Sequence, residues 1–274
     1  MIERWDNAGQ GNGAKSRMDM IPQGATEGQM LMDGMQAMAS VIEQETDHWL
    51  LQFNAEKLAG LGRIDSVVIV GPSGAGKSTA VDAARTWTQS EGVSGNFFVP
   101  QRVVSRPPRL NDNLVENRFA STPQEFEEMT RGGIQWDRKM DLEAAGRIEH
   151  YGFGPVPENA IPIYSANNAF LAPDAHLSGV APDFNEHALV MCVYAFPHIR
   201  AERLTKRSPD IMTKKPEEAA MRLAPMPEYV SERSHITMRT RDVEKERPLS
   251  AEAMLVMLRT IAKIKKTERQ EGAH

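Results

Sequence analysis

The clearest indication of the fold is the sequence Gly71-Pro72-Ser73-Gly74-Ala75-Gly76-Lys77-Ser78. It matches the pattern G-x-x-x-x-G-K-[ST] in full, and a chance match in 274 residues is expected in about one sequence in a hundred. The β-branched run at 64–70 predicts a buried parallel strand before it, and residues 79–89 predict a helix after it. A strand, a glycine-rich turn and a helix in this order indicate a loop that binds the phosphates of a nucleotide.

Each residue type in this loop has a chemical role. Glycines let successive backbone N–H groups point at phosphate oxygens, and the start of the helix adds its positive dipole end. Lys77 supplies a cation to the β- and γ-phosphates, and the Ser78 hydroxyl is the expected ligand of Mg²⁺, the predicted cofactor. The expected nucleotide-binding residues are Gly71, Ser73, Gly74, Ala75, Gly76, Lys77, Ser78 and Thr79. The loop alone leaves NTPase, GTPase and kinase chemistry open.

Composition and charge argue against several classes of protein. The formal net charge of -5 provides no general basic field for nucleic acid or for an anionic membrane. No apolar run reaches membrane-spanning length, and the acidic, glycine-rich N-terminal stretch differs from a secretion signal. Cys192 is the single cysteine, so an internal disulfide is excluded and a buried, inert thiol is predicted. We expect a cytoplasmic protein with no nucleic-acid and no membrane partner.

Three segments are predicted along the chain. Residues 1–25 are rich in Gly, Asn and Asp and predict a flexible tail, and residues 26–62 predict a helical N-terminal extension that ends at Gly60-Leu61-Gly62. The methionine-rich stripe of that extension packs on its own domain or forms a homo-oligomer. Residues 63–274 form an α/β domain with a parallel sheet flanked by helices. Further strands are predicted at 97–104 and 189–195, and further helices at 123–131, 197–207, 216–223 and 250–266.

A series of motifs follows the loop in a fixed order. It comprises Arg102-Val103-Val104-Ser105-Arg106-Pro107-Pro108-Arg109, Phe119, Glu125-Phe126, Trp136, Tyr151-Gly152, Arg203-Leu204-Thr205-Lys206-Arg207 and Arg222-Leu223. Over residues 64–224, this order resembles the guanylate kinase-like family of P-loop kinases. The resemblance implies a P-loop NTPase fold with a small acceptor-binding insertion and a lid.

The resemblance also implies roles for residues outside the loop. Guanidinium groups match phosphate oxygens, so the arginines after the second strand are expected to hold a phosphorylated acceptor. The expected acceptor-binding residues are Arg102, Arg106, Arg109, Glu116 and Tyr151. The expected catalytic residues, which close over ATP and stabilise charge in the transition state, are Lys77, Arg203, Arg207 and Arg222. Asp112 and Glu116 are candidates to orient the acceptor hydroxyl or a magnesium-bound water.

Two branches of this family predict different acceptors. Guanylate kinases read guanine with a Glu before the Trp, whereas Gln135 here accepts one hydrogen bond and presents a mismatched donor. Ribose 1,5-bisphosphate phosphokinases resemble this chain at Arg102 and Glu116-Asn117. The sequence therefore favours an ATP-dependent kinase of a phosphosugar such as ribose 1,5-bisphosphate. The alternatives are a GMP or dGMP kinase, a non-catalytic scaffold and a nucleotide-gated regulator.

Overall fold

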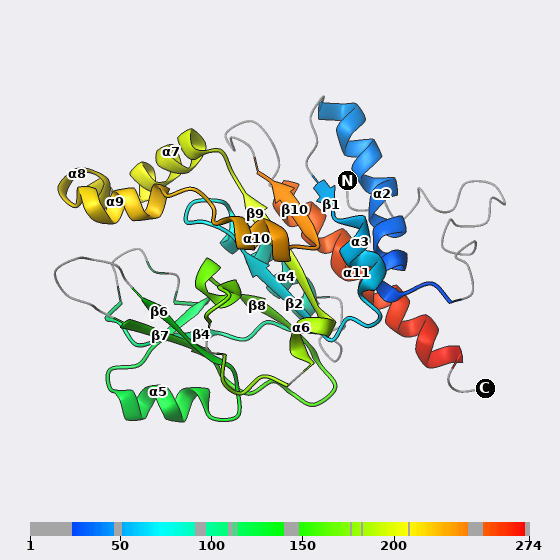
Figure 1. Ribbon diagram of the computed structural model, residues 1–274, viewed down its shortest axis with the longest axis horizontal. Helices are drawn as coiled ribbons and strands as arrows, with labels where there is room; N and C mark the ends of the chain where they lie inside the picture. Colours follow the sequence, from blue (N-terminus) through cyan, green and yellow to red (C-terminus); the bar gives the residue numbers. More distant parts are fainter. Residues whose placement is uncertain are drawn as a thin grey trace.

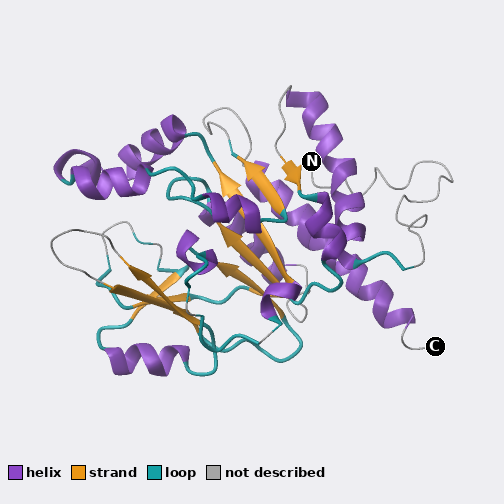
Figure 2. Cartoon of the chain, viewed as in Figure 1, coloured by secondary structure: helices purple, strands orange, loops and turns teal. Residues whose placement is uncertain are grey.

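The computed structural model describes residues 24–46, 51–90, 97–108, 112, 114–139, 148–175, 177–181, 183–207, 209–240 and 249–271. Within these ranges the chain forms two β-sheets with helices around them (Figures 1 and 2). We call the six-stranded sheet the main sheet and the four-stranded sheet the small sheet. Residues 1–23 of the predicted tail lie outside the described residues.

The main sheet is parallel except at one edge. Its strands, in spatial order, are β1 (Leu51–Phe53), β10 (Ile236–Arg239), β9 (Ala188–Tyr194), β2 (Ser66–Val70), β8 (Ile161–Ser165) and β3 (Phe97–Phe98). Only β1 runs antiparallel to its neighbour. The apolar runs predicted as strands at 64–70 and 189–195 are β2 and β9, which are neighbours in the sheet. Their residues are buried, as expected for strands that are apolar along nearly their whole length. The parallel α/β sheet is confirmed.

Long helices cover one face of the main sheet. These are α2 (Glu27–Thr46), α4 (Lys77–Ser90) and α11 (Leu249–Glu271). Val67 and Ile69 of β2 and the apolar side chains of these three helices form one buried core. Glu27 of α2 pairs with Lys265 of α11, 238 positions away in the chain, and accepts a hydrogen bond from the backbone N–H of Ile64 over 2.7 Å. The first and last described helices are therefore joined to each other and to the start of β2.

The small sheet packs on the opposite face. Its strands, in spatial order, are β5 (Asn117–Phe119), β4 (Arg102–Val104), β7 (Ile148–Phe153) and β6 (Gln135–Lys139). Val68 and Val70 of β2 share a buried core with Trp136 of β6, with the short helix η3 (Asn168–Leu171) and with α10 (Glu228–Arg233). The outer face of the small sheet is covered by α5 (Pro123–Thr130). The small sheet therefore has a covered outer face and an inner face turned to the main sheet.

Three short helices lie together beyond the end of β9, at the upper left of Figure 1. They are α7 (Pro197–Arg207), α8 (Pro209–Lys214) and α9 (Pro216–Leu223), and we call them the lid helices. The helices predicted at 197–207 and 216–223 are confirmed as α7 and α9. The sequence prediction missed α8, which occupies most of the expected break, and α6 (Phe184–His187).

Two predictions of secondary structure are wrong. The strand expected at 97–104 is divided into β3 and β4, which belong to different sheets, and Pro100 between them has no N–H to continue a ladder. The helical extension is interrupted because Leu51–Phe53 form the edge strand β1, which pairs with β10. The helix that follows, α3 (Ala55–Gly60), ends at the predicted glycine break.

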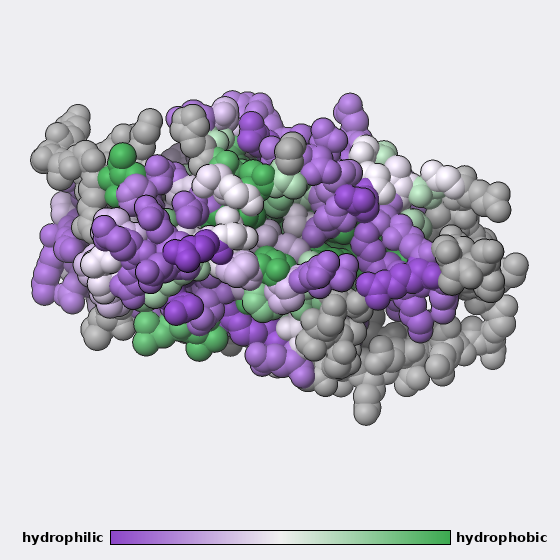
Figure 3. All heavy atoms as spheres, turned by 90° about the horizontal axis from the view of Figure 1, so that it is seen from below, coloured by the Kyte–Doolittle hydropathy of each residue, from purple (hydrophilic) through white to green (hydrophobic). Residues whose placement is uncertain are grey.

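The described part of the methionine-rich stripe packs within the chain itself. Leu31, Met32 and Met35 are buried in the core that α2 forms with α11. On the molecular face seen from below, apolar residues form small separate groups among hydrophilic ones (Figure 3). Among the described residues, no helix combines the length and the hydrophobicity needed to cross a bilayer. Assembly of several copies through α2 stays a prediction.

Candidate functional site

The phosphate loop connects β2 to α4 at the carboxyl edge of the main sheet, where parallel α/β sheets bind ligands. Gly71, Gly74 and Gly76 have φ values of 140°, 78° and 101°, which disfavour any residue with a side chain. A Cβ at Gly71 would lie 2.1 Å from the carbonyl oxygen of Val193. The curl of the loop therefore requires the glycines that the motif predicts, and Ser73 and Thr79 are exposed on it.

Lys77 folds back over its own loop. Its Nζ donates to the carbonyl oxygens of Gly71 at 2.6 Å and Pro72 at 3.0 Å. Burial, followed by the positive charge of Arg102, lowers the pKa of Lys77 to about 8. A nearby phosphate would favour the ammonium form, because an opposite charge stabilises it. An anion bound in the loop would therefore raise the pKa of Lys77 and favour its charged form.

Glu116 links the phosphate loop to both sheets. Its Oε2 accepts from the Ser78 hydroxyl at 2.9 Å, and its Oε1 accepts from the Ser165 hydroxyl at 2.8 Å, at the end of β8. Its Oε1 also lies 3.8 Å from Nη2 of Arg102. Burial alone would raise the pKa of Glu116, but Arg102, the two hydroxyls and Lys77 together lower it. Glu116 is therefore an ionised carboxylate beside the loop.

The Ser78 hydroxyl and the Glu116 carboxylate fit a Mg²⁺ ion. Both supply hard oxygen atoms, and Mg²⁺ is usually held by one or two protein ligands together with phosphates and water. The described residues contain no group of three or more His, Cys, Asp or Glu side chains arranged to hold a metal. With two protein ligands, a Mg²⁺ ion at this pair would take its other ligands from phosphates and water.

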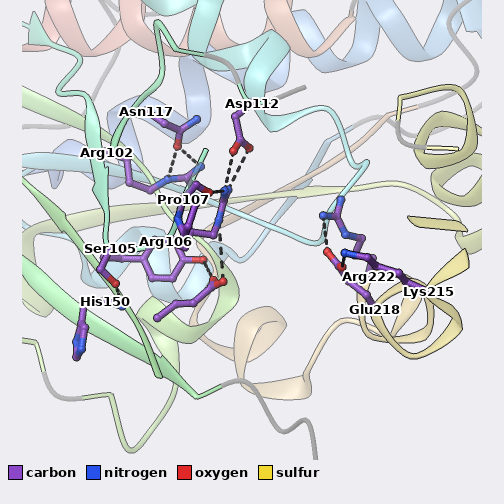
Figure 4. A network of polar contacts seen from close by, with 12 residues as sticks. Arg102, Ser105, Arg106, Pro107, Asp112, Asn117, His150, Lys215, Glu218 and Arg222 are labelled. Carbon is purple, nitrogen blue, oxygen red and sulfur yellow. Dashed lines mark hydrogen bonds and ion pairs between the residues drawn. The ribbon is translucent and has the colours of Figure 1, made fainter. Parts of the chain in front are cut away.

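The inner face of the small sheet gathers the predicted acceptor-binding residues. Arg102 donates to Asn117 Oδ1 through Nε at 3.0 Å and Nη2 at 2.7 Å, and its guanidinium lies 5.9 Å from the centre of the Tyr151 ring. Arg106 forms a two-pronged pair with Asp112, at 2.6 and 3.0 Å (Figure 4). Four of the five predicted residues, Arg102, Arg106, Glu116 and Tyr151, are thus placed around one site. The fifth, Arg109, lies outside the described residues.

Of the predicted lid arginines, Arg203 contacts the phosphate loop, Arg222 is paired within its own helix, and Arg207 is exposed. Arg203 Nη1 donates to the Gly74 carbonyl at 3.1 Å and to the Thr240 hydroxyl at 3.0 Å. Arg222 pairs with Glu218 on its own helix at 2.9 Å, and Figure 4 draws this pair apart from Arg102 and Arg106. Arg207 is exposed at the end of α7. Arg203 therefore touches the loop directly in this structure.

Sequence reasoning missed two residues that hold the loop. Arg200 is 1% exposed and donates to the carbonyls of Ser73 at 3.1 Å, of Ala224 at 3.1 Å and of Arg222. Thr240, which follows β10, donates to the Ala75 carbonyl at 2.7 Å. Their partners are main-chain carbonyls, which every residue type supplies, so no sequence pattern marks the pairing. The spacing of Arg200, one turn before Arg203, was the only available signal.

A buried carboxylate was also missed. Glu149 of β7 is 4% exposed and accepts from the Tyr151 hydroxyl at 2.5 Å. Gln135, at the position where guanylate kinases carry their base-reading Glu, donates instead to the Thr130 hydroxyl at 2.7 Å. Gln135 precedes the inward-facing Trp136 and bonds α5, so its side chain lies on the outer face of the small sheet, opposite the face that carries Glu149 and Tyr151.

Comparison with known proteins gives weak but consistent matches. The chain is 31% identical over 140 residues to the bifunctional ribose 1,5-bisphosphokinase-thymidine phosphorylase of Roseobacter denitrificans, covering 51% of this chain and 19% of that protein. It is 29% identical over 184 residues to the guanylate kinase of Corynebacterium glutamicum, covering 62% of this chain and 85% of that protein. A crystal structure of guanylate kinase from Anaplasma phagocytophilum matches with a TM-score of 0.37 and 13% identity, over 71% of this chain and 85% of that one. No protein-family model matches.

The two sequence matches confirm the resemblance to guanylate kinase-like P-loop kinases. Both relatives are kinases by name, and they represent the two branches that the sequence suggested. The chain spans about a fifth of the length of the bifunctional relative, so the second activity in that name concerns a protein much longer than this one.

Proposed function

We propose that the chain is an ATP-dependent phosphotransferase that moves the γ-phosphoryl group of ATP onto a phosphorylated small molecule. One observation carries this proposal: Glu116 contacts Ser78 of the phosphate loop and lies 3.8 Å from Arg102 of the small sheet. A donor site and a cationic acceptor site therefore meet at one carboxylate. Phosphoryl transfer depends mainly on such positioning and on neutralisation of phosphate charge.

The described residues suit separate tasks in this reaction. The loop from Gly71 to Ser78 would hold the phosphates of ATP, and Lys77 and Arg203 would neutralise their charge. A Mg²⁺ ion held by Ser78 and Glu116 would supply further neutralisation of the phosphate oxygens. Arg102, Arg106 and Tyr151 would bind and orient the acceptor, with Arg109 added from the sequence prediction. Arg207 and Arg222 of the lid helices would add further positive charge close to ATP.

A phosphosugar such as ribose 1,5-bisphosphate is the favoured acceptor. The reason is that the residue before Trp136 is the amide Gln135 instead of a carboxylate, and its side chain bonds Thr130 of α5 on the outer face of the small sheet. A GMP or dGMP kinase is the second candidate, favoured by the match that covers 85% of a guanylate kinase. A non-catalytic scaffold is the third. The predicted domain boundaries after residues 25 and 62, and the cytoplasmic location, stay predictions.

The test is acceptor-dependent release of ADP from ATP and Mg²⁺. The panel comprises no acceptor, ribose 1,5-bisphosphate, GMP, dGMP, AMP and several phosphosugars. We expect ADP release to depend on a phosphosugar, and the best acceptor identifies the branch. ATP binding without release on any acceptor would contradict the kinase proposal and favour the scaffold.

A further inference from the structure

Arg200 lies where the two ends of the lid helices meet the phosphate loop. It belongs to the start of α7, close to Pro197, at which the chain enters the lid helices. Its Nη1 donates to the carbonyl of Ala224 at 3.1 Å and its Nη2 donates to the carbonyl of Arg222, where the chain leaves α9. Its Nε donates to the carbonyl of Ser73 in the loop at 3.1 Å. One guanidinium group therefore joins both ends of the lid helices to the phosphate loop.

The loop also packs closely on the part of α7 that carries Arg200. A Cβ at Gly74 would lie 3.2 Å from the carbonyl oxygen of Arg200 and 3.2 Å from Cγ of Leu204. Arg203, one turn further along α7, donates to the carbonyl of Gly74 at 3.1 Å. Arg200 itself is 1% exposed. Because this contact is close-packed, a shift of the loop is transmitted to α7.

Arg200 is a buried cation whose partners carry no formal negative charge. Among the described residues, its partners are main-chain carbonyls, and no carboxylate forms an ion pair with it. A buried charge without a counter-ion lowers stability, so a neutral donor would be the better choice if the bonds served the fold alone. The charge also acts at the loop: burial is the main cause that lowers the pKa of Lys77 to about 8, and the positive charges of Arg102 and Arg200 lower it further. An anion bound in the loop would therefore offset the charge of Arg200.

We propose that Arg200 is a positioning residue that couples occupation of the phosphate loop to the orientation of the lid helices. This inference rests on the proposed function, because it requires the phosphates of ATP in the loop. Through α7, Arg200 holds Arg203 at the carbonyl of Gly74. Through the carbonyl of Arg222, it holds the end of α9, from which the side chain of Arg222 extends. One buried guanidinium group thus sets two of the predicted lid arginines relative to the loop.

The test is hydrogen exchange of the backbone amides of α4 and α9, measured by mass spectrometry with and without ATP and Mg²⁺ and in the absence of an acceptor. Hydrogen exchange reports the local opening of helices. With ATP at about ten times its dissociation constant, an opening that is incompatible with bound ATP becomes roughly 10-fold rarer. We expect exchange in the wild type to slow to this extent both in α4, which begins at the loop, and in α9.

Two variants separate the coupling from the binding of ATP. Arg200→Lys keeps the positive charge, but its single ammonium group cannot span the three carbonyls, and Arg200→Gln removes the charge as well. In both variants we expect ATP to slow exchange in α4 by roughly 10-fold but in α9 by less than about twofold. Arg131→Lys, at an exposed position after α5, is the matched control and should keep the wild-type pattern. Each protein is measured at ten times its own dissociation constant for ATP, which calorimetry gives.

Loss of the slowing in α9 alone supports the role of Arg200, because a purely structural residue would change exchange in α9 equally with and without ATP. Slowing in α4 but not in α9 of the wild type overturns the inference. Wild-type slowing of α9 in the variants also overturns it. Circular dichroism confirms folding: if one variant does not fold, the other decides, and if neither folds, Arg200 is a structural residue and the inference is wrong.

Failure of this inference is distinguishable from failure of the kinase proposal. Coupling of α9 to ATP without release of ADP on any acceptor supports the role of Arg200 and contradicts only phosphoryl transfer. Where ADP is released, kcat of Arg200→Lys should fall by roughly 10- to 100-fold, as for misplaced groups at a reacting centre. Release of ADP by Arg200→Lys at the wild-type rate overturns the inference and leaves the kinase proposal intact. Absence of ATP binding by the wild type overturns both.

Discussion

Ser78 donates a hydrogen bond to Glu116 over 2.9 Å, although the two residues are 38 positions apart in the chain. The bond joins the phosphate loop of the main sheet to the segment that precedes β5 of the small sheet. Since Glu116 also accepts from Ser165, its two oxygens hold three parts of the fold at fixed distances. Glu116 therefore adds a polar link between the loop and the proposed acceptor site, beside the apolar core that the two sheets share.

Replacement of Glu116 by Gln should weaken the use of Mg²⁺. The variant keeps the shape but loses the charge beside Ser78, so we expect the concentration of Mg²⁺ for half-maximal ADP release to rise by about tenfold. The control is Glu128→Gln on the exposed side of α5. An unchanged requirement for Mg²⁺ would contradict the assignment of Glu116 to the metal.

Lys77→Ala should abolish phosphoryl transfer while the fold stays intact. The variant loses a cation at the β- and γ-phosphates, which is expected to lower turnover by at least about 10²- to 10³-fold. ADP release measures the activity, and thermal unfolding measures the fold. Lys206→Ala, at the exposed end of α7, is the control. Turnover at the wild-type rate in Lys77→Ala would refute the role of the loop.

Binding of ATP should weaken as the pH rises through about 8. Burial and Arg102 lower the pKa of Lys77 to about 8, so the ammonium form that attracts phosphate is present below that pH and lost above it. The sign follows because ATP binds the protonated form, and the loss approaches tenfold per pH unit at most. Calorimetric titrations from about pH 7 to pH 9.5 measure it. Affinity that rises over this range would contradict the prediction, and Lys77→Ala should remove the dependence.

Gly71→Ala should destabilise the protein far more than Gly62→Ala. The first adds a Cβ 2.1 Å from the Val193 carbonyl at a φ of 140°, whereas the second adds a Cβ with no atom within 4 Å. We expect the free energy of unfolding to fall by more than about 2 kcal/mol in the first variant and to change by less than about 0.5 kcal/mol in the second. Urea unfolding of both measures the difference. Equal stability would show that the loop adopts another conformation.

Gln135→Glu should raise any activity on GMP. A carboxylate accepts strongly from the N–H groups of guanine, and the variant loses the donor that holds the side chain of Gln135 on α5 at the outer face. The ratio of kcat/KM for GMP to that for ribose 1,5-bisphosphate measures the change. If the ratio stays constant, residue 135 does not correspond to the base-reading position of guanylate kinases.

The sequence predicted the parts of the site that are local in the chain. The loop from Gly71 to Ser78 could be recognised because its conformation requires glycines at fixed positions, and the structure shows positive φ at three of them. The apolar strands β2 and β9 were recognised because burial on both faces leaves a continuous run. Arg102 and Arg106 were found by their resemblance to a family, and the structure places both on the inner face of the small sheet.

The parts that could not be predicted depend on contacts between distant segments. Leu51–Phe53 form a strand because they pair with the edge of β10. A segment of three residues carries no sequence pattern that predicts this partner. The division of 97–104 required knowing that β4 pairs with β5 and β7 instead of continuing β3. In the sequence, Glu149 cannot be told apart from an acidic residue on the surface. Only the pairing of β7 with β4 places it beside Arg106.

The ion pair between Glu27 and Lys265 has a consequence for synthesis of the protein on the ribosome. α11 packs on α4 and α2 and shares with them the apolar core on one face of the main sheet. A nascent chain that already carries the complete phosphate loop and both sheets still exposes that apolar face until α11 has been translated. The layer of helices over this face is therefore complete only once α11 has been translated, after the strands of both sheets.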